Sequence, residues 1–143
     1  MDKRFWICGA VVSFAALLLT LLIHAVLLAD DYAAVSNLYR DAQDGKRHFP
    51  WLLLAHALLG YAMTWIFARG FAQDRPGIAQ GLRFGLAMAL FSTIPAALVI
   101  YAVQPLPPSL VLRQALYGGL GMLLLGMLLA WLQPRRLVLS EPR

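Results

Sequence analysis

The stretch that decides the fold is FWICGAVVSFAALLLTLLIHAVLLA, residues 5–29, a run of about 25 residues without a Lys, Arg, Asp or Glu. An α-helix rises about 1.5 Å per residue, so this run can cross the roughly 30 Å hydrocarbon core of a bilayer. It is also longer than the apolar region of a secretory signal peptide, which is typically about 7–15 residues. We therefore predict an uncleaved first transmembrane helix at Phe5–Ala29.

Three further apolar stretches follow, at Pro50–Ala68, Ile78–Val103 and Ser109–Leu132. Over 143 residues, 61% are hydrophobic and 13% are charged, whereas a soluble domain carries roughly 45–50% and about 25%. This composition excludes a soluble enzyme, a disordered chain, a disulfide scaffold and a nucleic-acid-binding domain. We predict an all-α membrane protein, a four-transmembrane-helix bundle that forms one domain over residues 1–143.

Turn residues separate the spans. Asp44-Gly45 and Pro50 are expected to close the first loop, residues 74–77 the second and residues 104–109 the third, because Gly, Pro and Asp favour turns. Pro134 is expected to end the last helix. The first loop, residues 30–49, is the only sizeable one, and it predicts a short interfacial helix with one apolar face formed by Ala34, Val35, Leu38 and Tyr39.

Charge near the span ends predicts the orientation. The formal net charge is +5, and cytoplasmic flanks carry an excess of Lys and Arg. The larger group of basic residues shares the side of both termini, which predicts that both termini are cytoplasmic; it comprises Lys3, Arg4, Arg69, Arg75, Arg83, Arg135, Arg136 and Arg143. The opposite, outer side has Arg40, Lys46, Arg47 and Arg113. An aromatic belt near the span ends is expected to anchor the protein: Trp6, Trp51, Trp65, Trp131 and Tyr32.

Small residues predict which helix faces meet, because they let helix backbones approach closely in lipid. The first span carries such a face at Gly9, Ser13, Ala16, Thr20 and His24, and the second at His56, Gly60 and Thr64. In the third and fourth spans the predicted packing glycines are Gly77, Gly81, Gly85, Gly119 and Gly126. The further glycines Gly118 and Gly121 leave a second surface for a partner or another copy of the chain.

The few polar residues within the spans gather in the outer half. His24 lies roughly 7–8 Å below the outer end of its span, and His56 about 9 Å below the outer end of the next span. Ionisable residues at such depth are candidates for a functional site. The candidate ligand-binding or polar cluster comprises His24, His56, Arg113, Gln114, Asp31 and Tyr101.

Four interpretations of this cluster remain open. The two histidines could be axial ligands of a b-type haem, or they could donate hydrogen bonds to a quinone or lipid headgroup, with Arg113 for an anionic group. A divalent metal would need a third ligand such as Asp31. The fourth interpretation is a satisfied polar network, with Arg113 paired to Asp30 or Asp31 and the histidines bonded across helices.

Motifs of catalysis are missing from the sequence: there is no phosphate-binding loop, nucleophile elbow, zinc-protease motif or CxxC pair. We therefore expect a non-enzymatic accessory or assembly subunit of a larger inner-membrane complex, with other membrane subunits or self-association as its interactions besides the lipid bilayer. The alternatives are a small-ligand-binding protein that uses the outer-half cluster, and a small oligomeric transporter with a pathway around a kink at Pro95.

Two short motifs, Asn37-Leu-Tyr-Arg40 and Gly81-Leu-Arg-Phe-Gly85, lie within a plan of four spans with a long first hairpin. In this plan the chain resembles small uncharacterised four-span bacterial inner-membrane proteins. The resemblance covers the general layout of the whole chain and implies a bacterial inner membrane. It transfers no functional residue.

Overall fold

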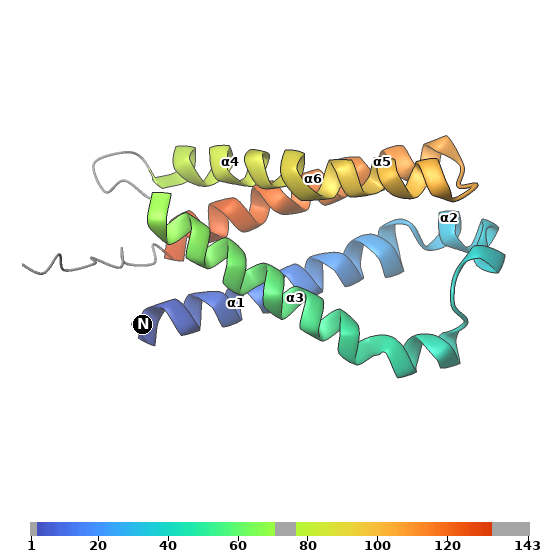
Figure 1. The fold of residues 1–143 in the computed structure, drawn as a ribbon, viewed down its shortest axis with the longest axis horizontal. Helices are drawn as coiled ribbons and strands as arrows, with labels where there is room; N and C mark the ends of the chain where they lie inside the picture. Colours follow the sequence, from blue (N-terminus) through green and yellow to red (C-terminus); the bar gives the residue numbers. More distant parts are fainter. Residues whose placement is uncertain (1–2, 71–76, 133–143) are drawn as a thin grey trace, which may run out of the picture.

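The computed structural model describes residues 3–70 and 77–132, and these residues form helices and short connections without a strand (Figure 1). Four helical segments are long and apolar enough to cross a membrane: Lys3–Leu27, Ala42–Gly70, Gly77–Val103 and Pro108–Leu132. The predictions of an all-α protein and of four membrane-spanning segments are therefore confirmed at this level.

Two of the four segments are interrupted by π-helical turns. The first consists of α1 (Lys3–Leu22) and the π-helical turn η1 (Ile23–Leu27). The third consists of α4 (Gly77–Met88), the π-helical turn η3 (Ala89–Thr93) and α5 (Ile94–Val103). The expected irregularity near Pro95 thus takes the form of a π-helical turn that ends just before this residue. The other two segments are the uninterrupted helices α3 (Ala42–Gly70) and α6 (Pro108–Leu132).

The predicted start of the second span is wrong, because α3 begins at Ala42 and runs through Pro50. The Asp41 carboxylate accepts hydrogen bonds from the backbone N–H groups of Gln43 and Asp44, at 2.9 and 2.8 Å. This is the arrangement of an N-terminal helix cap. Arg40 also pairs with Asp44, four residues further on. Since the helix is started by this cap, Asp44-Gly45 form its first turn, and Pro50 removes only one backbone hydrogen bond.

The segment between the first two spans forms two short helices rather than one: α2 (Ala29–Ala34) and the 3₁₀ turn η2 (Ser36–Leu38). The side chains of Val35 and Leu38 are partly buried, and they pack against an apolar core at the end of the bundle where α2 lies. That core consists of Ile23, Leu28, Ala97, Leu106, Leu110 and Val111. The segment therefore covers the ends of α1, α5 and α6, and we call this the α2 end of the bundle.

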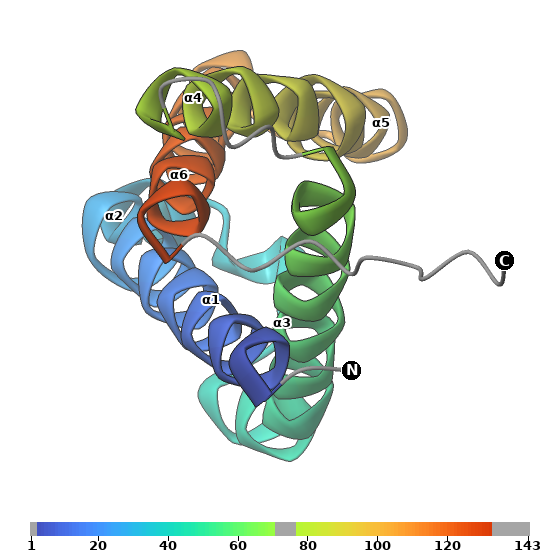
Figure 2. The same cartoon turned by 90° about the vertical axis from the view of Figure 1, so that its left-hand side faces the viewer.

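The helices form two antiparallel hairpins that meet along one seam. α1 packs along α3, α4 packs along α6, and α1 also packs against α6 (Figures 1 and 2). At the end opposite α2, Met63 and Phe67 of α3 join a core with Leu125 and Leu129 of α6. Toward the α2 end, α3 diverges from α5 (Figure 1). α3 therefore contributes to the buried core at the end opposite α2 and not to the core at the α2 end.

Glycine allows α4 and α6 to touch through their backbones. A Cβ atom on Gly126 would lie 2.2 Å from the Gly81 carbonyl oxygen, and one on Gly85 would lie 2.5 Å from the Met122 carbonyl oxygen. The contact on α6 continues four residues further back, where a Cβ on Gly118 would lie 2.5 Å from Thr93 Cγ2. These residues lie four apart, along a row that is inclined to the helix axis, so the helices cross.

Gly119 is not part of this contact, contrary to the prediction. A Cβ atom there would have no other atom within 4 Å. The predicted packing glycines of α6, Gly119 and Gly126, follow a line nearly parallel to the helix axis, whereas the inclined row reaches Gly118 instead. Gly77, the remaining predicted packing glycine, is the first residue of α4.

The two helices of the first hairpin, α1 and α3, approach each other as closely as α4 and α6 do. A Cβ atom on Gly60 of α3 would lie 2.4 Å from the Ser13 backbone nitrogen of α1, and one on Gly9 would overlap the ring of Tyr61. The structure therefore brings the small-residue faces of the first two spans together.

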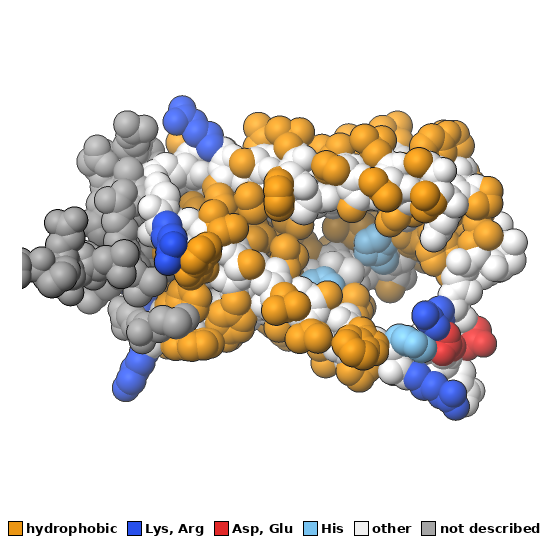
Figure 3. Space-filling model, viewed as in Figure 1, with side chains coloured by type: hydrophobic (Ala, Val, Ile, Leu, Met, Phe, Trp, Pro, Cys, Tyr) orange, Lys and Arg blue, Asp and Glu red, His pale blue; other side chains and the backbone are white. Residues whose placement is uncertain are grey.

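Basic residues lie at both ends of the bundle (Figure 3). Lys3, Arg4 and Arg69 belong to the end opposite α2, where the Arg4 guanidinium donates a hydrogen bond of 2.7 Å to the Leu132 carbonyl at the end of α6. Arg69 lies 3.8 Å from the ring centroid of Trp65. Other residues used for the orientation or the helix end lie outside the described residues: Arg75, Pro134, Arg135, Arg136 and Arg143.

We predict that Gly126→Ala destabilises the protein, whereas Gly119→Ala does not. The methyl group at residue 126 forces two backbones apart, at a cost of about 1–3 kcal/mol. At residue 119 the same methyl group meets open space and gains about 1 kcal/mol of helix propensity. Thermal unfolding in detergent, followed by circular dichroism, measures the difference. Equal midpoints for the two variants would contradict the packing described above.

Candidate functional site

Tyr32 of α2 is the centre of the polar cluster at the α2 end. The Nε2 amide of Gln114, on α6, donates a hydrogen bond of 2.7 Å to the Tyr32 hydroxyl oxygen. The same hydroxyl lies 2.5 Å from Nδ1 of His24, in the π-helical turn η1. The neighbouring elements η1 and α2 are thereby joined to α6, which is distant in sequence, through one phenol. The sequence predicted only membrane anchoring for Tyr32, and its central position is a correction to that interpretation.

The Tyr32 phenol is kept in its protonated form. Burial raises the pKa of Tyr32 above its ordinary value, and this effect outweighs the hydrogen bond from Gln114, which lowers it. The ring is held edge-on against Tyr39, with ring centroids 4.9 Å apart. At neutral pH the hydroxyl therefore has a proton to donate, and its orientation is fixed by packing.

His56 lies in a separate polar contact between α1 and α3. Its side chain is only 8% exposed. Nδ1 donates to the Leu52 carbonyl at 2.7 Å, and Nε2 lies 2.8 Å from the Thr20 hydroxyl. Because a neutral imidazole has one donor and one acceptor nitrogen, the Thr20 hydroxyl donates to Nε2. Both ring nitrogens of His56 are thus used within the protein.

Arg113 and Asp31 form an ion pair, with Nη1 2.8 Å from the carboxylate Oδ2. Arg113 is about half exposed, so this pair belongs to the surface of the α2 end. Tyr101 is 44% exposed and stands apart from the cluster. Of the six predicted residues, the structure joins His24 with Gln114 through Tyr32 and Arg113 with Asp31, while His56 and Tyr101 lie elsewhere.

A polar cavity of about 340 Å³ opens beside Tyr32, within the usual range of roughly 300–1,000 Å³ for small-molecule pockets. Its polar lining consists of His24, Tyr32, Tyr39, Thr93, Gln104 and Gln114. Ala96, Ala97, Ile100 and Gly118 complete the wall. Figure 3 shows the hollow between α5 and α3, with histidine side chains visible inside it.

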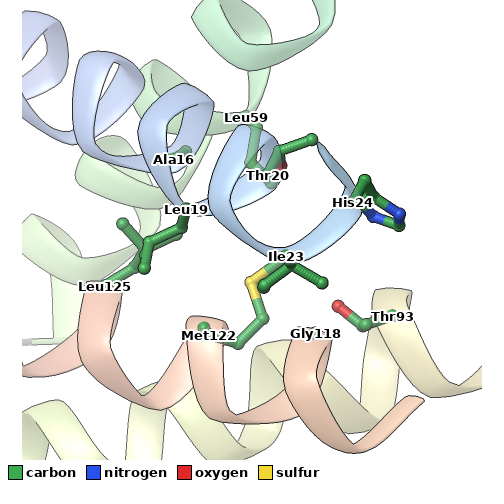
Figure 4. A pocket seen from close by; sticks show the side chains of 11 residues that line it. Ala16, Leu19, Thr20, Ile23, His24, Leu59, Thr93, Gly118, Met122 and Leu125 are labelled. Atoms are coloured by element: carbon green, nitrogen blue, oxygen red, sulfur yellow. The ribbon is translucent and has the colours of Figure 1, made fainter. Parts of the chain in front are cut away.

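A smaller, apolar cavity of about 140 Å³ lies deeper between α1 and α6 (Figure 4). It shares His24, Thr93 and Gly118 with the polar cavity. The rest of its lining is almost entirely apolar: Ala16, Leu19, Thr20, Ile23, Leu59, Gly121, Met122 and Leu125. The two cavities therefore adjoin. Apolar surface predominates in both, and polar side chains are more numerous in the lining of the larger cavity, beside α2.

Both π-helical turns border the boundary between the two cavities. η1 carries His24, and η3 ends with Thr93, so each turn supplies one of the residues that the two cavities share. A π-helical turn inserts an extra residue into a helix and is frequently found at functional sites. The coincidence of two such turns at one cavity boundary distinguishes it from an ordinary packing defect.

The haem and metal interpretations do not fit this geometry. An axial haem ligand needs a free lone pair on a ring nitrogen, whereas Nε2 of His56 accepts from Thr20. Within residues 3–70 and 77–132, no group of three His, Cys, Asp or Glu residues could hold a metal ion, so His24, His56 and Asp31 are not a ligand set. The arrangement retains the features of a satisfied polar network around an open cavity.

No protein-family model, no curated protein and no solved structure shows significant similarity to this chain.

We predict that Thr20 and His56 stabilise the first hairpin as a pair. Thr20→Val removes the donor to Nε2 of a buried imidazole, and the free energy of unfolding should fall by about 0.5–2 kcal/mol. In a double-mutant cycle with His56→Phe, the second substitution should then cost clearly less than it does alone. Unfolding in mixed micelles provides the measurement. Strictly additive effects would show that the two side chains do not interact.

Proposed function

We propose that this protein is an integral membrane protein that binds a small amphipathic molecule taken up from the bilayer. The observation that carries the proposal is the pair of adjoining cavities, which is polar at Tyr32 and apolar at Met122 and Leu125. A molecule with a polar head and an apolar body matches this gradient, because each part then meets a lining of its own polarity.

Access from the membrane supports the same proposal. α3 diverges from α5 toward the α2 end (Figure 1), and the molecule is hollowed on this side (Figure 3). A molecule dissolved in the bilayer would enter between these helices without first crossing water. His24 is exposed at this opening.

The finer cellular assignments remain proposals as well. We propose a bacterial inner membrane with both termini on the cytoplasmic side, on the basis of the excess of Lys and Arg near the ends of the spans opposite α2. The α2 end, with the polar cavity, would then face outward. A role as an accessory or assembly subunit of a larger complex, or as an oligomeric transporter, stays a prediction from the sequence.

We predict that filling the polar cavity expels the bound molecule. Ala96 lines the cavity from α5, so Ala96→Phe places a ring within it. Ala102→Phe makes the same change on the same helix outside the cavity lining and is the matched control. Mass spectrometry of organic extracts from the purified proteins should find an amphipathic molecule with wild type and Ala102→Phe, and at least about fivefold less with Ala96→Phe.

Equal recovery from Ala96→Phe and Ala102→Phe would contradict the proposed function. Thermal unfolding of both variants checks that the difference arises from the cavity rather than from loss of the fold.

A further inference from the structure

We propose that the polar cavity selects an uncharged headgroup that accepts a hydrogen bond from Nε2 of His24, and that the ligand is therefore a carbonyl-bearing lipid. This inference rests on the proposed function and specifies its ligand class. Three features of the described residues lead to it: the direction of a hydrogen-bond relay, the charge of the lining and the shape of the two cavities.

The relay runs from Gln114 through Tyr32 to His24. An amide NH₂ group can only donate, so Gln114 occupies a lone pair of the Tyr32 hydroxyl. In the proposed relay the phenol gives its own proton to Nδ1 of His24, 2.5 Å away. If Nδ1 donated instead, the phenol proton would have no acceptor among the described residues. The neutral imidazole consequently carries its proton on Nε2, which becomes a donor.

His24 lines both cavities, so its ring borders the place where they adjoin. None of the described residues donates to or accepts from its Nε2. A hydrogen-bond donor at membrane depth is costly to leave without a partner. A carbonyl oxygen is the acceptor that an uncharged lipid most commonly offers.

The lining excludes a charged head. No Lys, Arg, Asp or Glu occurs among the described residues that line either cavity. Arg113, which the sequence offered for an anionic group, is paired with Asp31 and does not contribute to the lining. A phosphate would enter this space without a countercharge, at a large desolvation cost. The expected binding of an anion by Arg113 is therefore replaced by recognition of a neutral head.

The rest of the ligand would follow the apolar wall. Beyond His24, the smaller cavity continues past Gly118 to Met122 and Leu125, and this wall suits an alkyl or isoprenoid body. The shared chemistry, a carbonyl group on an apolar chain, occurs in membrane quinones and in the esters of acylglycerols. These two sources are distinguished by the probes below.

The test measures binding of four probes to the full chain in nanodiscs of saturated phosphatidylcholine. The probes are 2-decyl-1,4-benzoquinone, 1,2-dioctanoylglycerol, decylbenzene and decyl phosphate. We expect at least one carbonyl probe to bind about tenfold more tightly than decylbenzene, the effect of one hydrogen bond, and decyl phosphate to bind most weakly. The tighter carbonyl probe identifies the source.

Variants of His24 test the donor. His24→Phe should abolish the preference for the carbonyl probe over decylbenzene, whereas His24→Gln, which keeps an amide donor, should retain most of it. Tyr32 acts as a positioning residue. In Tyr32→Phe the preference should fall about threefold to tenfold, and the ¹⁵N spectrum of His24 should change from one tautomer, protonated at Nε2, to a mixture.

The outcomes separate the two proposals. If Ala96→Phe blocks all probes but His24→Phe keeps the carbonyl preference, the headgroup assignment is wrong and the proposed function stands. If Ala96→Phe leaves the binding of every probe unchanged, the proposed function is wrong as well. A preference for decyl phosphate, or no preference for either carbonyl probe, also overturns the inference.

Discussion

The contact between the backbones of α4 and α6 at Gly81 and Gly126 is the constraint on which the rest of the structure depends. Apolar side chains gain little by leaving lipid for another helix, so membrane helices associate through close packing and hydrogen bonds. Glycine supplies that packing here, since a Cβ atom at Gly126 would lie only 2.2 Å from the Gly81 carbonyl oxygen. The equivalent contact of Gly60 with Ser13 closes the first hairpin.

The open side of the bundle follows from where these contacts end. On α3 the small-residue face runs from Thr64 through Gly60 to His56, which makes a hydrogen bond to Thr20. Beyond His56, toward the α2 end, α3 continues as a regular helix through Pro50 while α1 changes to a π-helical turn. At this level η1 supplies His24, the residue of the first span that lines both cavities.

The sequence predicted those parts of the fold that are encoded in short, regular patterns. Apolar runs predicted the four spans, and residues four apart predicted the close faces at Gly60, Gly81, Gly85 and Gly126. The prediction was wrong where two local signals compete: Pro50 was taken as a boundary, but the cap at Asp41 starts the helix earlier. It was also wrong at Gly119, because the helix crossing that selects Gly118 is a property of two helices together.

The candidate site was only partly predictable for a related reason. His24 and Gln114 were identified because polar residues within apolar runs are conspicuous, but nothing in their spacing indicates that one phenol joins them. Tyr32 lies outside the spans, and its position depends on how α2 folds back over the bundle. The two π-helical turns have no clear sequence signal, yet they supply the shared residues His24 and Thr93 of the cavities.

The relay explains why this end of the bundle holds so many polar groups at so little cost. In hydrocarbon each unpaired donor or acceptor costs several kcal/mol, and no described buried side-chain nitrogen or oxygen lacks a partner. The partners of Arg113 and His56 lie within the chain, so these two groups have little left to offer a ligand. His24 differs, because Tyr32 uses Nδ1 and leaves Nε2 at the opening. The donor on His24 therefore stands beside the other polar side chains of the lining, among them Thr93, Gln104 and Gln114, and the packing leaves the polar groups of this cavity, rather than Arg113 or His56, to meet a ligand.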